Sequence, residues 1–202
     1  MSCYEWERGS VKIPAGELAG VKKAIRDAYN REMSDGYAVA MRLYEGLKKA
    51  KPKARAKMWE DKGRRECRGM ADGMKWRVEK ALFGQQVMWG DVPKLRRPTK
   101  AMFPMATNRA TRFVLDTDAQ IVFDGNVLHW DVRENNHAVD YAWESPVASA
   151  MDRALKKVKW TARTGGFFET QDEYDRDAGS GSRITHTYGK APVGKMTRYI
   201  YR

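Results

Sequence analysis

The residues best suited to catalysis in this 202-residue chain are two polar side chains at positions two apart, His129 and Asp131. They occur in NVLHWDV, where apolar and polar residues alternate as in a half-buried β-strand. A two-residue step on a strand places both side chains on one face, about 7 Å apart at Cα. Carboxylate oxygens suit Mg²⁺ or Mn²⁺ and an imidazole can act as a base, so the pair could begin a site for phosphodiester hydrolysis.

Such a site would need a third group. The candidates are a nearby histidine and four carboxylates of a later acidic segment, namely His137, Asp172, Glu173, Asp175 and Asp177. A histidine and an aspartate on the solvated face of a strand nevertheless require no function, and the sequence favours this second interpretation. We therefore expect no catalytic residue, no bound metal and no cofactor, and we favour a non-enzymatic protein over an enzyme.

Local patterns of other chemistries are missing from the sequence. There is no phosphate-binding GxxxxGK[ST] loop, no GxGxxG turn and no GxSxG nucleophile elbow. Two cysteines and three scattered histidines give no zinc-ligand spacing, and no basic-zipper pattern occurs. Cys3 and Cys67 are too few for a disulfide framework, so we expect free thiols.

Positive charge is concentrated in residues 48–80, which hold thirteen Lys or Arg and five Asp or Glu. This excess of +8 is most of the net charge of +12 carried by the whole chain. Such a concentration attracts phosphate polymers, acidic protein surfaces or anionic membranes. The cations that we expect to contact nucleic acid are Lys48, Lys49, Lys51, Lys53, Arg55, Lys57, Arg64, Arg65, Arg68, Lys75, Arg77 and Lys80.

Trp76 lies within this basic stretch and could add an aromatic contact. Apolar residues recur there at three- and four-residue steps and predict a helix with one core-facing stripe: Cys67, Met70, Ala71, Met74, Val78, Ala81 and Leu82. Trp76 falls close to the opposite side of that helix, where its ring could stack on a base while cations neutralise phosphates. Trp59 is a second candidate for stacking. The alternative is that Trp76 packs beneath another element.

The N-terminal half predicts about three helices after a short strand at residues 4–13, in which Gly9 and Ser10 would form a turn or bulge. The first helix runs from Pro14 to Met33, residues 34–36 break it, and the second runs from Tyr37 to Leu47. The basic segment supplies the third helix.

The C-terminal half predicts strands. Asp124-Gly125 between two apolar runs indicates a hairpin, and Ser145-Pro146 begins a helix that ends near Lys157. Further strands are expected at 158–163, from 167 after a Gly165-Gly166 turn, at 183–188 and at 196–201. The fold class is therefore α+β, with a helical N-terminal half followed by a mostly antiparallel sheet that contains one inserted helix.

Charge also divides the chain. Residues 1–100 carry a net charge of +11 and residues 101–202 a net charge of +1. We expect a basic helical region at 1–91, a proline-containing linker or arm at 92–104 and an α+β region at 105–202, although all three could form one continuous domain. The N-terminus lacks the apolar segment of a secretion signal, so we expect a cytoplasmic location and no membrane partner.

Three functions remain open at this stage. The leading hypothesis is a non-enzymatic protein that binds nucleic acid, or a nucleoprotein complex, with little sequence specificity. The second is an accessory inhibitor or adaptor, of the anti-defence kind found in phages and mobile elements. It would dock on a protein partner through the acidic segment at Asp172, Glu173, Asp175 and Asp177. The third is a metal-dependent nuclease that uses His129 and Asp131.

Overall fold

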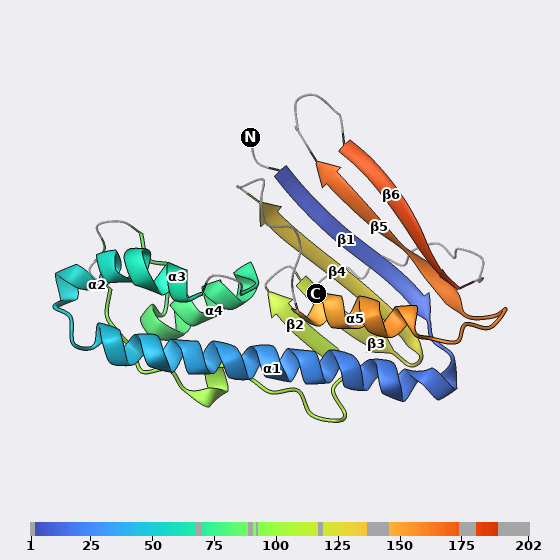
Figure 1. Cartoon of the computed structure of the whole chain (residues 1–202), viewed down its shortest axis with the longest axis horizontal. Coiled ribbons are helices and arrows are strands. Elements are labelled where there is room, and N and C mark those ends of the chain that lie inside the picture. The colour runs from blue at the N-terminus through green and yellow to red at the C-terminus, as the bar shows by residue number, and fades with distance from the viewer. Residues whose placement is uncertain are drawn as a thin grey trace.

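The computed structural model describes residues 3–67, 70–88, 91, 93–116, 119–136, 146–173 and 181–189. Six strands form one antiparallel sheet in the order β2-β3-β4-β1-β5-β6, with helices gathered beside it (Figure 1). The strands are β1 (Cys3–Lys12), β2 (Arg112–Asp116), β3 (Ala119–Asp124), β4 (Val127–Asn136), β5 (Gly165–Glu173) and β6 (Gly181–Gly189). The helices are α1 (Ala15–Leu47), α2 (Pro52–Met58), the π-helix η1 (Trp59–Gly63), α3 (Arg64–Glu66), α4 (Asp72–Phe83), the 3₁₀-helix η2 (Lys100–Met102) and α5 (Pro146–Lys156). The predicted α+β class is confirmed.

The leading strand, β1, lies in the middle of the sheet. It pairs along its length with β4 on one side and with β5 on the other. Gly9 does not form the predicted turn but continues the strand, opposite Trp130 of β4. A Cβ on Gly9 would lie 2.0 Å from the Trp130 ring, so the glycine makes room for a buried aromatic side chain.

A single helix of 33 residues, α1, replaces the two helices that we predicted for residues 14–47. The break expected at residues 34–36 does not occur. Gly36 is buried, and a Cβ there would lie 2.3 Å from the Met74 sulfur. The glycine therefore allows α4 to approach α1 closely, and this packing offsets its cost of about 1 kcal/mol inside a helix.

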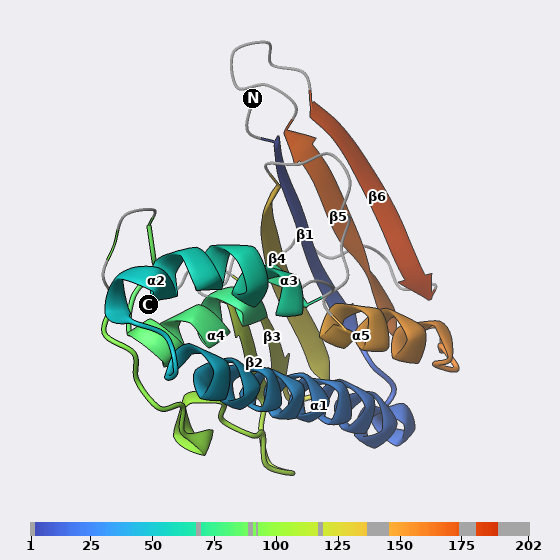
Figure 2. The ribbon, with the colours of Figure 1, turned by 60° about the vertical axis from the view of Figure 1, so that its left-hand side comes forward.

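The two halves of α1 have different neighbours. The N-terminal half packs on the sheet, where the Tyr29 ring meets Phe113 of β2 edge to face at 5.5 Å, and beside α5. The C-terminal half extends past the sheet, and α2, α3 and α4 gather on it (Figures 1 and 2). The molecule is therefore elongated along α1, with the sheet beside one half of this helix and a helical lobe on the other.

The predicted hairpin is confirmed, with Gly125 and Asn126 as its two turn residues between β3 and β4. Gly125 has φ +56°, the left-handed conformation that a tight hairpin requires. Asn126 fixes the turn against the end of β1, because its backbone accepts a hydrogen bond from the Ile13 amide at 2.8 Å and its side chain donates to the Ile13 carbonyl at 3.1 Å.

Helix α5 begins at Pro146 as predicted and buries Val147, Met151 and Leu155. Ser145, its expected N-cap, lies outside the described ranges.

The strand predicted for residues 158–163 is wrong, because this segment forms a loop. Gly165 and Gly166 are the first residues of β5 rather than a turn, and the strands predicted from 167 and at 183–188 are confirmed as parts of β5 and β6. The strand expected at 196–201 falls outside the described part of the chain.

The proline-containing arm, residues 92–104, and the residues just after it pack against the helices. Asn30 of α1 exchanges two hydrogen bonds with the backbone of Ala106, at 2.7 and 3.0 Å, and Phe103 is buried against Tyr37.

Buried side chains of the sheet, α1 and the helical lobe form one hydrophobic cluster. None of the described helices has an apolar stretch long enough to cross a membrane.

Candidate nucleic-acid interface

The basic segment folds as two helical stretches rather than as one helix: α2, η1 and α3 follow one another without a break over residues 52–66, and α4 begins at Asp72. Its predicted apolar stripe faces inward, since Cys67, Met74, Val78, Ala81 and Leu82 are all buried. Trp59 and Gly63 are the first and last residues of the π-helix. A Cβ on Gly63 would lie 2.1 Å from the Trp59 ring, so the glycine leaves room for this ring to pack.

Burial separates the predicted cations into three groups. Those with exposed side chains are Lys48, Lys49, Lys51, Lys53, Lys57, Arg65 and Lys80. Those partly buried are Arg55, Lys75 and Arg77. The side chain of Arg64 and the whole of Arg68 are not in the described part of the structure. The exposed set is therefore contributed by the end of α1, by α2, by α3 and by α4.

Two acidic residues of the segment make contacts within the protein. Glu79 of α4 is buried and accepts hydrogen bonds from the Trp59 indole at 2.8 Å and from the Val87 amide at 3.1 Å. Glu66 of α3 pairs with Arg42 of α1 at 2.8 Å. Because Glu79 is buried, it subtracts less from the outward positive charge than the residue count suggests, whereas Glu66 remains exposed and subtracts in full.

Trp76 lies at the surface of α4, with 39% of its area exposed, so the alternative in which another element covers it is wrong. The Lys80 ammonium lies 4.9 Å from the centre of its ring, a cation–π contact between residues one helical turn apart. Trp59 is 3% exposed and its indole is hydrogen-bonded to Glu79, so it cannot stack on a ligand as we predicted. Trp76 is the aromatic residue of the segment that a ligand could reach.

Arg77 lies near acidic and aromatic groups of α1 rather than fully in solvent. Burial raises the pKa of Glu32 to about 7, the Arg77 charge lowers it in part, and the Asp35 charge raises it. Burial likewise raises the pKa of Tyr29, again with Arg77 opposing. The Nε atom of Arg77 is buried and makes no hydrogen bond to the described residues. Arg77 thus contributes to the contact between α1 and α4.

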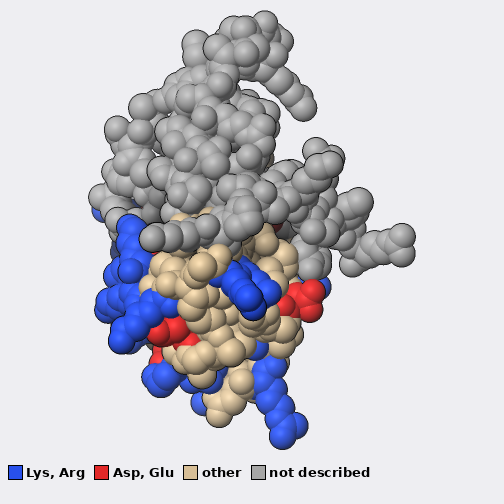
Figure 3. Space-filling model, turned by 90° about the vertical axis from the view of Figure 1, so that its right-hand side faces the viewer, with Lys and Arg blue, Asp and Glu red and all other residues tan. Residues whose placement is uncertain are grey.

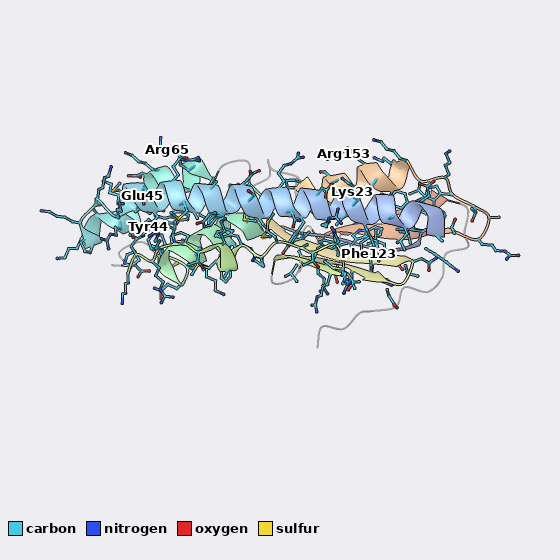
Figure 4. All side chains as sticks on the ribbon, turned by 90° about the horizontal axis from the view of Figure 1, so that it is seen from below. Lys23, Tyr44, Glu45, Arg65, Phe123 and Arg153 are labelled. Carbon is cyan, nitrogen blue, oxygen red and sulfur yellow. The ribbon has the colours of Figure 1, made fainter. Side chains whose placement is uncertain are left out.

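Lys48 at the end of α1 has two nearby partners. It forms an ion pair with Glu45, and its ammonium lies 5.9 Å from the centre of the Tyr44 ring. The hydrogen bond from Lys48 is the main cause that lowers the pKa of Glu45. In Figure 4, Tyr44, Glu45 and Arg65 are labelled at this end of α1, and numerous side chains project outward around them. Lys48 is therefore partly neutralised, whereas the lysines of α2 have no ion pair among the described contacts.

His129 and Asp131 share one face of β4, as predicted, and the intervening Trp130 is buried on the other. Both polar side chains are partly buried, and burial lowers the pKa of His129 while the Asp124 charge raises it. In the described ranges no three His, Cys, Asp or Glu side chains are grouped to hold a metal ion. His137, the third candidate, lies in residues that the structure does not describe.

The acidic segment proposed for partner binding is only partly described. Asp172 and Glu173 are the last residues of β5, where their backbones pair with Ser182 and Gly181 of β6. They therefore belong to the sheet rather than to a loop. Asp175 and Asp177 follow β5 outside the described ranges.

A second concentration of cations escaped the sequence interpretation. Five basic residues occur between Arg153 and Arg163, and no acidic residue lies between Arg153 and Phe168. All five basic side chains are exposed. The stretch spans the end of one predicted element and the start of the next, so its charge does not belong to either; a count of basic and acidic residues over eleven positions reveals it.

Comparisons of the chain with models of protein families, with curated proteins and with solved structures found no match.

Proposed function

We propose that this protein binds nucleic acid, alone or in a nucleoprotein complex, without catalysing a reaction and with little sequence specificity. The observation that carries the proposal is the set of exposed cations on the helical lobe beside the exposed ring of Trp76. The exposed set holds six lysines and one arginine. Lysine contacts phosphate as a mobile point charge, whereas sequence-specific recognition of base edges relies chiefly on side chains that donate two hydrogen bonds, such as arginine. The surface is therefore suited to contact with the phosphate backbone of a nucleic acid.

Trp76 gives the surface a second mode of contact. An exposed indole beside Lys80 can stack on an unpaired base while the ammonium remains near the adjacent phosphate. Stacking of this kind tolerates any base and is possible only where bases are unstacked from a duplex. We therefore expect Trp76 to favour single strands and the lysines to contribute to both forms.

The proposal is tested by following the anisotropy of fluorescent single-stranded and duplex DNA and RNA at several salt concentrations. Binding should weaken as salt rises, with a slope of log affinity against log salt of about 0.9 per phosphate contacted on duplex DNA. The variant K51Q/K53Q/K57Q, which neutralises three exposed lysines of the α2 region, should lower both affinity and slope. Trp76→Ala should weaken binding to single strands more than binding to duplexes.

A matched control removes the same charge from elsewhere. Arg31, Arg109 and Arg112 are exposed and lie outside the basic segment, so R31Q/R109Q/R112Q should retain most of the affinity. Equal losses in the two triple variants would show that net charge alone drives binding. Absent or salt-independent binding by the wild type would refute the proposal and favour a protein partner.

A further inference from the structure

The five cations between Arg153 and Arg163 form a surface apart from the helical lobe. Arg153 and Lys156 lie in the last turn of α5, where positive charge stabilises the helix dipole, and this role accounts for them. Lys157, Lys159 and Arg163 lie beyond the last turn and are exposed. None of these three takes part in an ion pair or a side-chain hydrogen bond among the described contacts. No structural role explains their charge, which leaves them available to a partner.

Hydrogen bonds and buried side chains hold the loop that carries these cations. The Thr161 amide donates to the Thr164 hydroxyl at 2.8 Å, and the two threonine hydroxyls are also 2.8 Å apart. Val158 is buried, and the Trp160 ring packs at 6.1 Å from the ring of Tyr188, whose hydroxyl donates to Asp152 at 2.8 Å. The backbone positions of the cations are therefore fixed, so little order need be gained on binding.

This cationic loop lies at the opposite end of α1 from the helical lobe. Its helix, α5, meets the start of α1, where Arg153 and Lys157 line a shallow groove with Glu17 and Gly20. Figure 4 labels Lys23 and Arg153 at this end of α1, and Arg65 and Glu45 at the other. Figure 3, viewed from the right-hand side of Figure 1, shows Lys and Arg along the left edge of this face and also at its centre and lower right.

Between the two ends the net charge is small, +2 over residues 18–44. Helix α1 carries five basic and five acidic residues, a net charge of zero, and its 33 residues span about 50 Å at 1.5 Å per residue. The basic segment at one end has a net charge of +8, and residues 153–163 at the other have +5. The molecule thus presents two cationic surfaces held apart by a neutral helix.

We propose that the chain bridges two segments of nucleic acid, one bound by the helical lobe and one by the loop of Lys157, Lys159 and Arg163. This inference rests on the proposed function and adds a second site to it. Two separate segments fit the arrangement better than one duplex laid along α1, because such a duplex would contact the middle of the helix, where residues 18–44 have a net charge of only +2, and gain little from it.

The test uses two short DNA duplexes, one with a donor fluorophore and one with an acceptor. A length of about 12 base pairs, or about 40 Å at 3.4 Å per base pair, is shorter than α1 and prevents one duplex from reaching both ends. Wild-type protein should produce energy transfer that rises and then falls as protein exceeds DNA, because excess protein separates the duplexes. K157Q/K159Q/R163Q should abolish the transfer yet lower the affinity for a single duplex only a few-fold. R31Q/R109Q/R112Q should retain both.

The outcomes separate the inference from the proposed function. Energy transfer that persists in K157Q/K159Q/R163Q would overturn the bridging inference, since another surface or a second copy of the chain would then join the duplexes. Salt-dependent binding of single duplexes without energy transfer in the wild type would also overturn it, while leaving the proposed function intact. No binding of either duplex would refute both. Circular dichroism of each variant confirms that a loss does not come from unfolding.

Discussion

Glu32 is a residue whose ionisation is strongly altered by its place in the fold. It lies on α1 near Arg77 of α4. Burial raises its pKa to about 7, the charge of Arg77 opposes this rise, and the charge of Asp35 adds to it. The folded protein therefore holds a proton on Glu32 at a pH where the unfolded chain, with a value near 4.5, has lost it. The ionised form is the less stable one in the folded state, so this carboxyl weakens the fold at neutral pH.

This linkage predicts how stability depends on pH. Between pH 4.5 and 7 the folded state binds more protons than the unfolded state, so the contribution of Glu32 to the free energy of unfolding falls as pH rises, and it is constant above this window. Glu32→Gln, a neutral mimic, should match the wild type near pH 4.5 and be more stable at pH 8, by up to about 3 kcal/mol. Urea unfolding at the two pH values measures the difference. Arg77→Gln should enlarge the stability gain from Glu32→Gln at pH 8, because it removes the charge that lowers the pKa of Glu32. A gain that is the same at both pH values would contradict the assigned pKa shift.

At the scale of elements, α1 offers two glycines with opposite surroundings. Gly20 has nothing within 4 Å of an added Cβ, whereas a Cβ on Gly36 would lie 2.3 Å from the sulfur of Met74 and 3.1 Å from Phe103. Both neighbours are buried and have little room to move. One substitution in one helix can therefore have opposite effects.

Gly20→Ala should stabilise the protein by about 1 kcal/mol, the gain in helix propensity. Gly36→Ala has the same gain but must displace Met74, at a cost of about 1–3 kcal/mol for an overfilled core, so it should lower the free energy of unfolding. Chemical denaturation of the two variants gives the comparison. If Gly36→Ala proved as stabilising as Gly20→Ala, the close approach of α4 to α1 would be wrong.

The same glycine shows what the sequence could and could not predict. Alternation and periodicity predict the hairpin at Gly125, helix α5 and the buried stripe of α4, because each depends on residues near one another in the chain. Gly36 could not be recognised as a packing position, since Met74, the residue that requires it, is distant in the sequence. Trp59 was misplaced for the same reason, because Glu79, which accepts its hydrogen bond, lies twenty residues away. The cations of the loop after α5 needed no distant information and were missed only because their charge was not counted.

At the scale of the whole molecule, the chain concentrates like charges that repel one another. Lys51 is the N-cap of α2 and Lys53 lies in its first turn, which contains no acidic residue. Positive charge at a helix N-terminus opposes the helix dipole, so both lysines are unfavourable for folding. Lys57 lies inside the helical stretch, because η1 and α3 continue it to Glu66, so the dipole has little effect on it. A binding surface that retains such charges is expected to exchange stability for affinity.

K51Q/K53Q should therefore raise the free energy of unfolding at low salt, by about 0.5–1 kcal/mol, while weakening nucleic-acid binding. Lys57→Gln should also weaken binding but leave stability nearly unchanged, because Lys57 lies away from both ends of the helical stretch formed by α2, η1 and α3. At about 1 M salt, where the screening length is about 3 Å, the two variants and the wild type should converge in stability. Thermal unfolding across a salt series measures this, beside anisotropy titrations of the same proteins. If K51Q/K53Q raises the free energy of unfolding at high salt as well, the cause is helix propensity rather than charge. If K51Q/K53Q lowers the free energy of unfolding at low salt, the two lysines stabilise the fold rather than serve a ligand.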